Sequence, residues 1–300
     1  MIELKNLTKK FGDKIAVDNM NMRLEEGHVI GLIGQNGAGK TTTFRMMLDF
    51  IKPTHGTITW DNHAITNHDK QNIGFLPEER GLYQKLSIEQ QVIYFAELHG
   101  MTKADAKQKL KHWMTRLDVV GKVTDKVQSL SKGNAQKVQL IATVIAEPSL
   151  LILDEPFTGL DPVNTQLMMN EISRLKKNGA MIIFSSHNMS GVEKLSDELL
   201  MLKHGQTVLS GGLVEIRESF GRSEIYLEST VPDAELLAIP GVLSVEQDGR
   251  GRHLKLSNDD AGKEVFRTVS KDGYVPVFAQ QPPTLDEIFR REVAGGDTND

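Results

Sequence analysis

The sequence predicts an α/β fold followed by a second, smaller α+β domain. Two segments, Leu150–Leu153 and Met181–Phe184, contain only apolar residues, as strands do when a parallel sheet is covered on both faces. The glycine pair Gly211-Gly212 interrupts the pattern and marks a boundary. We therefore predict a first domain over residues 1–212 and an accessory domain over residues 213–300.

Composition and charge narrow the possible classes of protein. The chain has 300 residues, 39% of them hydrophobic, and no cysteine, so disulfides and thiolate metal sites are excluded. The net charge of −5 gives no sign of a nucleic-acid-binding surface. The N-terminus lacks the features of a secretory signal, and the longest apolar stretches fall far short of the ~20 residues that span a bilayer. We expect a soluble, cytoplasmic protein that reaches a membrane only through a partner.

Apolar patterning predicts the strands of the N-terminal part. Met20, Met22 and Leu24 share one face, as period-two alternation requires. The predicted strands are Ile2–Leu7, Met20–Leu24, Val29–Ile33, Thr57–Trp60 and Ile73–Leu76. We expect an antiparallel β subdomain to form beside the parallel core.

The pattern changes to that of helices over residues 84–147. Ser87 and Gln90 have the spacing of a capping box at the start of this helical insertion. Strands return after the insertion, and Leu199–Leu202 with Thr207–Leu209 looks like a hairpin that closes the sheet. The first domain is therefore an α/β core with a helical subdomain inserted into it.

The accessory domain has strand and helix signals in the order βαββαβ. They are Glu224–Glu228, Asp233–Ala238, Val242–Gln247, His253–Leu256, Gly262–Val269 and Val275–Ala279. This order predicts a ferredoxin-like unit. A terminal helix, Thr284–Val293, and a frayed tail, Gly295–Asp300, are expected to follow.

A glycine-rich loop lies between the predicted strand Val29–Ile33 and a predicted helix, Lys40–Leu48. It matches the phosphate-binding pattern G-x-x-x-x-G-K-[ST], in which backbone N–H groups converge on an anion at a helix N-terminus. Lys40 is expected to reach the outer phosphates and the Thr41 hydroxyl to hold Mg²⁺. The alternative, a glycine-rich turn with an exposed lysine, leaves the flanking strand and helix unexplained. We assign nucleoside triphosphate binding to Gly34, Gln35, Asn36, Gly37, Ala38, Gly39, Lys40, Thr41 and Thr42.

Two carboxylates directly follow the strand Leu150–Leu153. Parallel sheets place ligand chemistry at the carboxyl ends of their strands, and successive side chains alternate faces. Asp154 is therefore expected to approach Mg²⁺, and Glu155 to orient or deprotonate the attacking water. The alternative is a solvated acidic turn. His187 stands at the end of a second core strand, Met181–Phe184, although a lone histidine is otherwise more often a surface or core residue.

The segment Leu130–Asn134 precedes a helical run. Ser131 can cap that helix, and Gly133 permits an anion to approach free N–H groups. Five motifs then follow one order along the chain: Gly34–Thr41, Leu130–Asn134, Leu153–Pro156, Gly159–Pro162 and His187. In this order and spacing, residues 2–212 resemble the ATP-binding cassette (ABC) ATPases.

The resemblance implies a phosphate-loop NTPase core that binds and hydrolyses ATP with Mg²⁺. Cassettes of this family pair head to tail, so that the signature loop of one copy, here Leu130–Asn134, completes the ATP site of the other. Ser131 and Gly133 would contact the γ-phosphate across the dimer. Asp154 would serve Mg²⁺, and Glu155 would be the catalytic base.

The resemblance also implies roles for residues around the nucleotide. Asp161 would lie in the interfacial D-loop, and His187 would sense the γ-phosphate. Phe11, with Val17 nearby, matches the aromatic residue that stacks on adenine. The alternative for Phe11 is that it is simply a residue of the sheet.

Two motifs depart from the family pattern. The signature loop usually reads Leu-Ser-Gly-Gly-Gln, whereas this chain has Lys132 and Asn134 at the third and fifth positions. Ser131 and Gly133 are retained, so the anion-binding geometry can be retained. Glu78 stands where the family usually has a glutamine that serves Mg²⁺ and the attacking water. A carboxylate can coordinate Mg²⁺, but it adds negative charge beside Glu155.

The stretch Leu76–Tyr83 and the tail segment Thr284–Phe289 resemble bacterial ABC-2-type export ATPases, a group that includes sodium-extrusion and drug- or peptide-resistance cassettes. The resemblance implies integral membrane permease subunits and a second copy of this chain as partners, with no nucleic acid. The protein would then lie at the inner face of the cell membrane. The loop Pro77–Tyr83 would link the catalytic carboxylates to a groove that receives a helix of the membrane subunit.

Two other functions remain open from the sequence. A soluble ABC ATPase acting on nucleic acid or the ribosome usually has two cassettes, or coiled-coil or zinc insertions, whereas this chain has one phosphate loop and no cysteine. A phosphate-loop kinase would leave Leu130–Asn134 and His187 unexplained. The ATPase subunit of a membrane transporter that works as an exporter accounts for all of these motifs.

Overall fold

The computed structural model describes residues 1–79, 81–271 and 273–294. The chain divides into two compact units, Met1–Ser210 and a second that begins at Gly211, and each has its own hydrophobic core. The frayed tail predicted over residues 295–300 lies outside the described residues.

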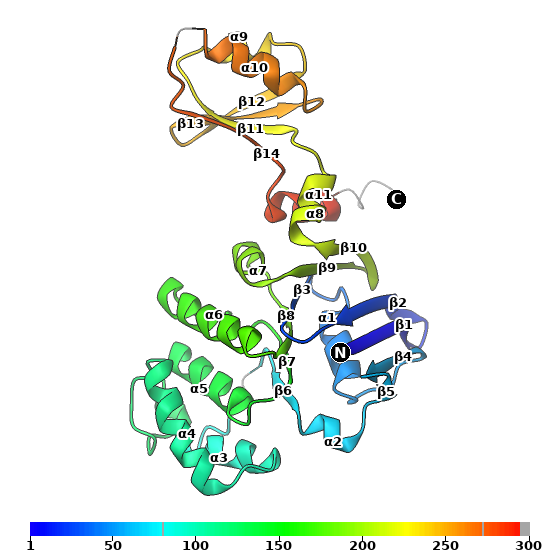
Figure 1. Ribbon diagram of the computed structural model, residues 1–300, viewed down its shortest axis with the longest axis vertical. Coiled ribbons are helices and arrows are strands. Elements are labelled where there is room, and N and C mark those ends of the chain that lie inside the picture. The colour runs from blue at the N-terminus through cyan, green and yellow to red at the C-terminus, as the bar shows by residue number, and fades with distance from the viewer. Residues whose placement is uncertain (80, 272, 295–300) are drawn as a thin grey trace. The chain divides into compact units, whose positions relative to one another are not determined.

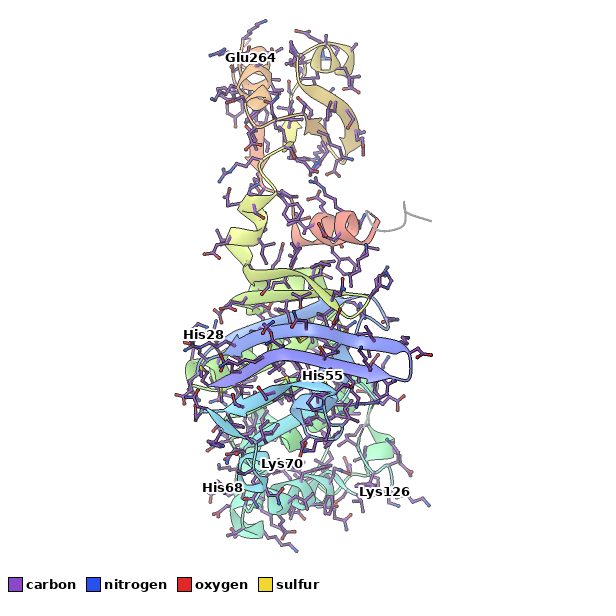
Figure 2. The ribbon with its side chains drawn as sticks, turned by 90° about the vertical axis from the view of Figure 1, so that its right-hand side faces the viewer. His28, His55, His68, Lys70, Lys126 and Glu264 are labelled. Carbon is purple, nitrogen blue, oxygen red and sulfur yellow. The ribbon has the colours of Figure 1, made fainter. Side chains whose placement is uncertain are left out.

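A four-stranded antiparallel sheet forms one part of the first unit, in the order β2-β1-β4-β5. Figure 2 shows its strands lying across the view, with His55 of β4 labelled. The first two strands are longer than the alternation predicted, because Asn6 and Asn19 have positive φ and the register shifts beside them, which interrupts the period-two pattern. The strands are β1 (Ile2–Phe11), β2 (Lys14–Leu24), β4 (His55–Trp60) and β5 (His63–Ala64).

A six-stranded sheet forms the core of the first unit, in the order β10-β9-β3-β8-β7-β6. The five strands from β9 to β6 are parallel, so the loops that leave β3, β6, β7 and β8 all start at one edge. The strands are β3 (Val29–Gly34), β6 (Ile73–Leu76), β7 (Leu150–Leu153), β8 (Met181–Ser185), β9 (Glu198–Lys203) and β10 (Gln206–Gly212). That edge is where an open α/β sheet binds its ligands.

Helices complete the first unit, and α3, α4 and α5 pack on one another as the predicted helical insertion (Figure 1). Ser87 and Gln90 form the predicted capping box at the start of α3. The helices are α1 (Lys40–Met47), α2 (Asn67–Lys70), α3 (Ile88–Leu98), α4 (Lys103–Arg116), α5 (Lys132–Val144), α6 (Pro162–Lys177) and α7 (Met189–Leu195), with a 3₁₀ turn at Val127–Ser129. The sequence did not predict α2, a single polar turn with no buried residue.

The second unit has the predicted βαββαβ order, with the sheet order β12-β13-β11-β14. Its apolar face, which includes Ile225, Leu227 and Leu254, packs with residues of α9 and α10. The sequence missed α8, because the glycines beside it indicated only a boundary. The elements are α8 (Leu213–Ser219), β11 (Glu224–Glu228), α9 (Asp233–Leu237), β12 (Val242–Asp248), β13 (Gly251–Leu256), α10 (Ala261–Val269), β14 (Val277–Gln281) and α11 (Leu285–Ala294).

Candidate functional site

A cavity of about 470 Å³ lies at the carboxyl edge of the six-stranded sheet. It brings together the turn between β1 and β2, the start of α1, and the segments that follow β6, β7 and β8. Its lining residues are Phe11, Lys14, Ala16, Asn36, Gly37, Gly39, Lys40, Thr41, Thr42, Glu78, Asp154, Glu155 and His187. Most of the residues assigned from the sequence to nucleotide, metal and catalysis therefore meet in one place.

The glycine-rich loop has a backbone that other residues cannot easily adopt. Gly34, Gly37 and Gly39 all have positive φ, of 153°, 80° and 113°. A Cβ on Gly34 would lie 2.4 Å from the Leu202 carbonyl oxygen, and one on Gly39 would lie 2.5 Å from the Ala16 carbonyl oxygen. Glycine is therefore required for both the loop conformation and its close packing.

The Lys40 ammonium lies inside this loop. It donates hydrogen bonds to the carbonyl oxygens of Gly34, at 2.6 Å, and of Gln35, at 3.2 Å. Burial lowers the pKa of Lys40, and the nearby carboxylates, chiefly that of Glu155, oppose this effect. A phosphate entering the loop would replace weak carbonyl acceptors with an anionic one, which forms stronger hydrogen bonds to an ammonium.

Three oxygen-bearing side chains are linked beside the loop. The Ser185 hydroxyl donates to Asp154 Oδ1 at 2.6 Å, and the Thr41 hydroxyl donates to Asp154 Oδ2 at 3.2 Å. Adjacent ligands of an octahedral Mg²⁺ ion lie about 3.0 Å apart when each metal–oxygen bond is about 2.1 Å. The Thr41 and Asp154 oxygens therefore fit a Mg²⁺ site, and Glu78 supplies a further carboxylate on the cavity wall.

Glu155 occupies a strained and buried position. Its backbone is left-handed, with φ 50°, and its N–H donates to Ser185 Oγ at 2.9 Å. Its Oε2 accepts from the His187 backbone N–H at 3.3 Å, whereas Oε1 lies 3.2 Å from His187 Nε2 and has no hydrogen-bond partner among the described residues. Burial raises the pKa of Glu155. A carboxylate held in this way is a stronger base than an exposed one.

The raised pKa predicts how Glu155 affects the stability of the nucleotide-free protein. A folded-state pKa above the ordinary value of 4.5 means that the folded protein binds this proton more tightly than the unfolded chain. The free energy of unfolding therefore falls as pH rises from about the ordinary pKa of 4.5 through the higher pKa of the folded state. We expect Glu155→Gln to raise the melting temperature at pH 7, by about 2–4 °C for each kcal/mol relieved.

Differential scanning fluorimetry from pH 4 to pH 8 tests this expectation. The gain should shrink as pH falls toward 4, and exposed Glu26→Gln should show no such trend. A gain that is independent of pH would show that ionisation of Glu155 does not cause it.

The two residues predicted to lie beside adenine, Phe11 and Val17, have different surroundings. Phe11 ends β1, has 51% of its surface exposed, lines the cavity and has the Lys9 ammonium 5.1 Å from its ring centre. Val17 is fully buried in the core and is absent from the cavity lining, and its side chain packs against Gly39 of the phosphate loop. Lys14 and Ala16 line the cavity instead. Their position in the first residues of β2, directly after the turn that follows Phe11, was the signal that could have found them.

Gly34, Gln35 and Ala38 belong to the phosphate loop but do not line the cavity. The first two offer carbonyl oxygens to Lys40, and Ala38 is 4% exposed. These three residues support the conformation of the loop and do not form the cavity wall.

The signature loop lies apart from the cavity, and none of its residues lines it. Ser131 caps α5 and is exposed. The Asn134 side-chain oxygen accepts from the Val120 N–H at 3.2 Å, so it fastens the preceding loop. Lys132 lies over Gly159, where an added Cβ would come within 2.4 Å of the ammonium nitrogen.

Asp161 begins α6, where its Oδ1 accepts from the Asn164 N–H at 2.9 Å. That hydrogen bond lowers the pKa of Asp161. Gly133 lies close to Asn164 and Leu160. The signature loop and the segment from Gly159 to Asp161 are therefore neighbours within one subunit.

Comparisons with known proteins identify the family to which the chain belongs. Residues 17–158 match the family model described as ABC transporter, and residues 211–293 match the C-terminal domain of DrrA1-3-like ATP-binding proteins. The chain is 41% identical, over 98% of both chains, to the uncharacterized ABC transporter ATP-binding protein YhaQ of Bacillus subtilis. It is 28% identical to the Nod factor export ATP-binding protein I of Burkholderia lata, over 97% of this chain and 96% of that one.

Solved structures give the same result. The chain resembles the structure of an ATP-binding subunit of an ABC transporter with a TM-score of 0.69 and 27% identity, over 74% of this chain and 93% of that one. Within the described residues, no helix is both long and apolar enough to cross a membrane. The chain belongs to the family of ABC transporter ATP-binding proteins and is an ATPase of that family.

Proposed function

We propose that this ATPase works with Mg²⁺, as a head-to-tail pair of copies, on a membrane permease that exports its substrate. The observation that carries the proposal is the meeting of Lys40, Thr41, Asp154, Glu155 and His187 in one cavity. These residues supply a cation for phosphates, oxygen ligands for a metal, and a base.

The chain's own residues account for the main steps of hydrolysis. When ATP binds, the Lys40 ammonium turns from the loop carbonyls to the outer phosphates. This contact holds the γ-phosphate in line with the water that Glu155 activates. Glu155 takes the proton of the attacking water, and the His187 backbone and ring hold the carboxylate in position. Mg²⁺, held by Thr41 and Asp154, would neutralise charge that develops on the phosphates.

The position of the signature loop supports a pair of copies. Ser131 is exposed at the start of α5 but lies outside the cavity of its own subunit. Its backbone donors at a helix N-terminus suit an anion. A second copy placed head to tail would bring this loop to the phosphates.

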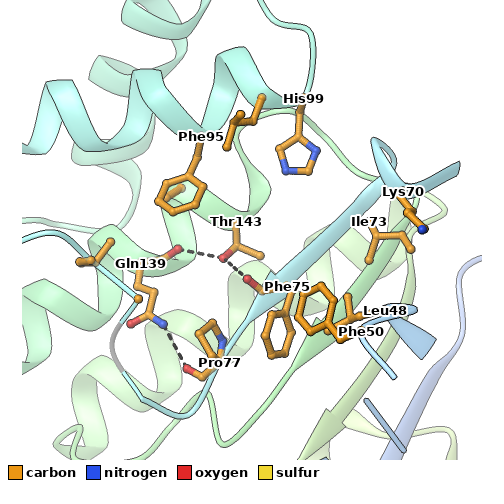
Figure 3. Close-up of a pocket in the computed structure, with 14 residues that line it drawn as sticks. Leu48, Phe50, Lys70, Ile73, Phe75, Pro77, Phe95, His99, Gln139 and Thr143 are labelled. Atoms are coloured by element: carbon orange, nitrogen blue, oxygen red, sulfur yellow. Dashed lines mark hydrogen bonds between the residues drawn. The ribbon is translucent and has the colours of Figure 1, made fainter. Parts of the chain in front are cut away.

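A second cavity supports a partner for the first unit. It is an apolar groove of about 370 Å³ between β6, α3 and α5. Figure 3 shows Phe50, Phe75 and Phe95 around it, with Gln139 and Thr143 hydrogen-bonded along one side. Phe50 and Leu98 are 67% and 57% exposed there. An apolar helix end is the kind of partner that such a groove accepts.

Adjacent residues connect this groove to the nucleotide. Pro77 lines the groove and Glu78 lines the nucleotide cavity. The Pro77 carbonyl accepts a hydrogen bond of 3.1 Å from the Gln139 side chain. A partner that moves this strand end therefore moves Glu78, which couples the two sites.

We expect Phe50→Ser with Leu98→Ser to keep basal ATPase activity and to lose stimulation by the membrane partner. Both side chains are exposed, so their loss costs little folding stability. The measurement is ATPase activity with and without the co-purified permease in vesicles, beside the melting temperature. The control is Leu243→Ser, which removes a side chain of similar exposure, 65%, in the second unit.

Two outcomes would contradict this assignment of the groove. In one, the double variant keeps full stimulation, and in the other, basal activity falls together with the melting temperature. Leu82, by contrast, is 6% exposed in the groove wall, so its substitution is expected to test packing rather than coupling.

The direction of transport rests on the name of the Nod factor export relative and on the second unit shared with it. Reconstitution with the permease tests this direction, because export predicts ATP-dependent substrate movement into inside-out vesicles and out of right-side-out vesicles loaded with ATP. Uptake into the cytoplasmic side would contradict export.

A further inference from the structure

Three side chains of kinds that ligate metals meet in the second unit, and none of them lines the nucleotide cavity. They are Glu224 on β11, His253 on β13 and Glu287 on α11, elements labelled in Figure 1. One ligand atom from each, a carboxylate oxygen or an imidazole nitrogen, lies within 4.8 Å of the other two. The sequence motifs gave these residues no role.

The strand pattern explains why two of them share a face. Ile225 and Leu227 are fully buried in the core, so Glu224 and Tyr226 point to the opposite face of the sheet. Tyr226 is paired with His253 across the strands, and their rings lie 5.7 Å apart. Glu224 and His253 are therefore diagonal neighbours on the face that the core does not use.

Each carboxylate already has one oxygen held by a partner. Glu224 Oε1 pairs with the Arg291 guanidinium. Glu287 Oε2 accepts from the Thr284 N–H at 2.6 Å and from its hydroxyl at 2.8 Å. The second oxygen of each carboxylate remains for a shared ligand. Fixing one oxygen in this manner orients the other, as outer partners do in metal sites.

The two carboxylates also lie close to each other. One oxygen of Glu224 and one of Glu287 come within 4.8 Å, and two ionised carboxylates have only acceptors. A proton or a cation between them would relieve their repulsion, in addition to the guanidinium of Arg291 at Glu224 Oε1. Glu224 is 7% exposed, which makes an unbalanced charge there costly.

The surroundings allow an ion to enter. A hollow of about 500 Å³ opens beside the three residues and is also lined by Glu246 and Asp248. Three Lys and Arg side chains stand on the same wall, and each is ion-paired: Arg291 with Glu224, Lys255 with Glu246 at 3.7 Å and Arg290 with Asp286 at 2.7 Å. Because a carboxylate balances each of these positive charges, the wall does not repel an entering cation.

We propose that Glu224, His253 and Glu287 bind a divalent transition-metal ion of the zinc class. One imidazole and two carboxylates are the mixed donors that Zn²⁺ accepts, whereas Mg²⁺ prefers oxygen ligands and retains water. Tetrahedral bonds of about 2.0–2.2 Å would bring the three donor atoms to about 3.3–3.6 Å from one another. Because Glu287 lies on α11, the ion would fasten this terminal helix to the sheet.

Zinc titration of the full chain, freed of metal and nucleotide, tests the proposal. We expect calorimetry to give one site per chain that requires these residues, and zinc to raise the melting temperature. His253→Ala and Glu224→Gln should each weaken zinc affinity at least tenfold and remove the thermal shift. Glu235→Gln is the control, because Glu235 is an exposed carboxylate of α9 that lies outside both the hollow and the three-residue group.

The competing outcomes are distinct. Unchanged zinc affinity in both variants would overturn the site, as would the absence of any zinc binding, which would leave a proton between the carboxyl groups. Zinc binding that disappears in His187→Asn but persists in His253→Ala would place the ion in the nucleotide cavity. Equal affinity for Mg²⁺ would overturn the assigned class of metal. None of these results depends on ATP hydrolysis.

Discussion

We expect Glu155→Gln to slow ATP hydrolysis by about 10²–10⁴-fold, the usual contribution of a positioned general base. The amide keeps the shape of the side chain but cannot take a proton from water. ATP binding should persist, because Lys40 and the phosphate loop are unchanged. The measurement is steady-state phosphate release beside nucleotide affinity.

The same variant should trap a nucleotide-bound pair of copies. With hydrolysis blocked, ATP remains between the phosphate loop and the signature loop, so light scattering should report a dimer in the presence of ATP and Mg²⁺. Glu26→Gln, an exposed glutamate, is the control and should hydrolyse ATP at the wild-type rate. A wild-type rate in Glu155→Gln would show that another group activates the water, and a persistent monomer with bound ATP would count against the pair in the isolated chain.

The core strands and the residues of the nucleotide cavity could be predicted because short stretches of sequence specify them. Positions 34 and 39 of the phosphate loop require glycine because a Cβ there would collide with a neighbouring backbone carbonyl oxygen. Asp154-Glu155 directly follows a strand whose side chains are all buried. Parallel strands then bring distant loops to one edge of the sheet, so Thr41, Asp154 and His187 meet without any special signal between them.

The parts that the sequence missed depend on packing between distant segments. Val17 has the spacing of an adenine neighbour, yet its apolar side chain is buried completely and Ala16 takes the cavity wall. Asn134 holds the Val120 N–H of its own subunit, a contact that no local pattern indicates. The meeting of Glu224, His253 and Glu287 likewise depends on strand register and on where α11 docks on the sheet.

The largest remaining effect is expected from Ser131→Arg, which should abolish hydrolysis while single-subunit ATP binding is largely retained. Ser131 is exposed and lies outside the cavity of its own subunit, so a large cation there leaves that cavity intact. It would instead block the approach of a second copy's phosphates. Thr115→Arg, at an exposed position of α4, controls for the added charge, and the melting temperature controls for folding.

Mixing two inactive variants separates a role across the dimer from a role within one subunit. Lys40→Ala should be inactive because its own phosphate loop has lost the lysine, whereas Ser131→Arg should be inactive because it cannot complete its partner's site. A mixed pair has one site with both defects and one site with none. Equal mixing should therefore restore about a quarter of the wild-type rate, because about half of the pairs are mixed and each has one intact site of two. If the mixture stays as inactive as its parts, or if Ser131→Arg alone hydrolyses ATP normally, the signature loop does not act on the partner's nucleotide.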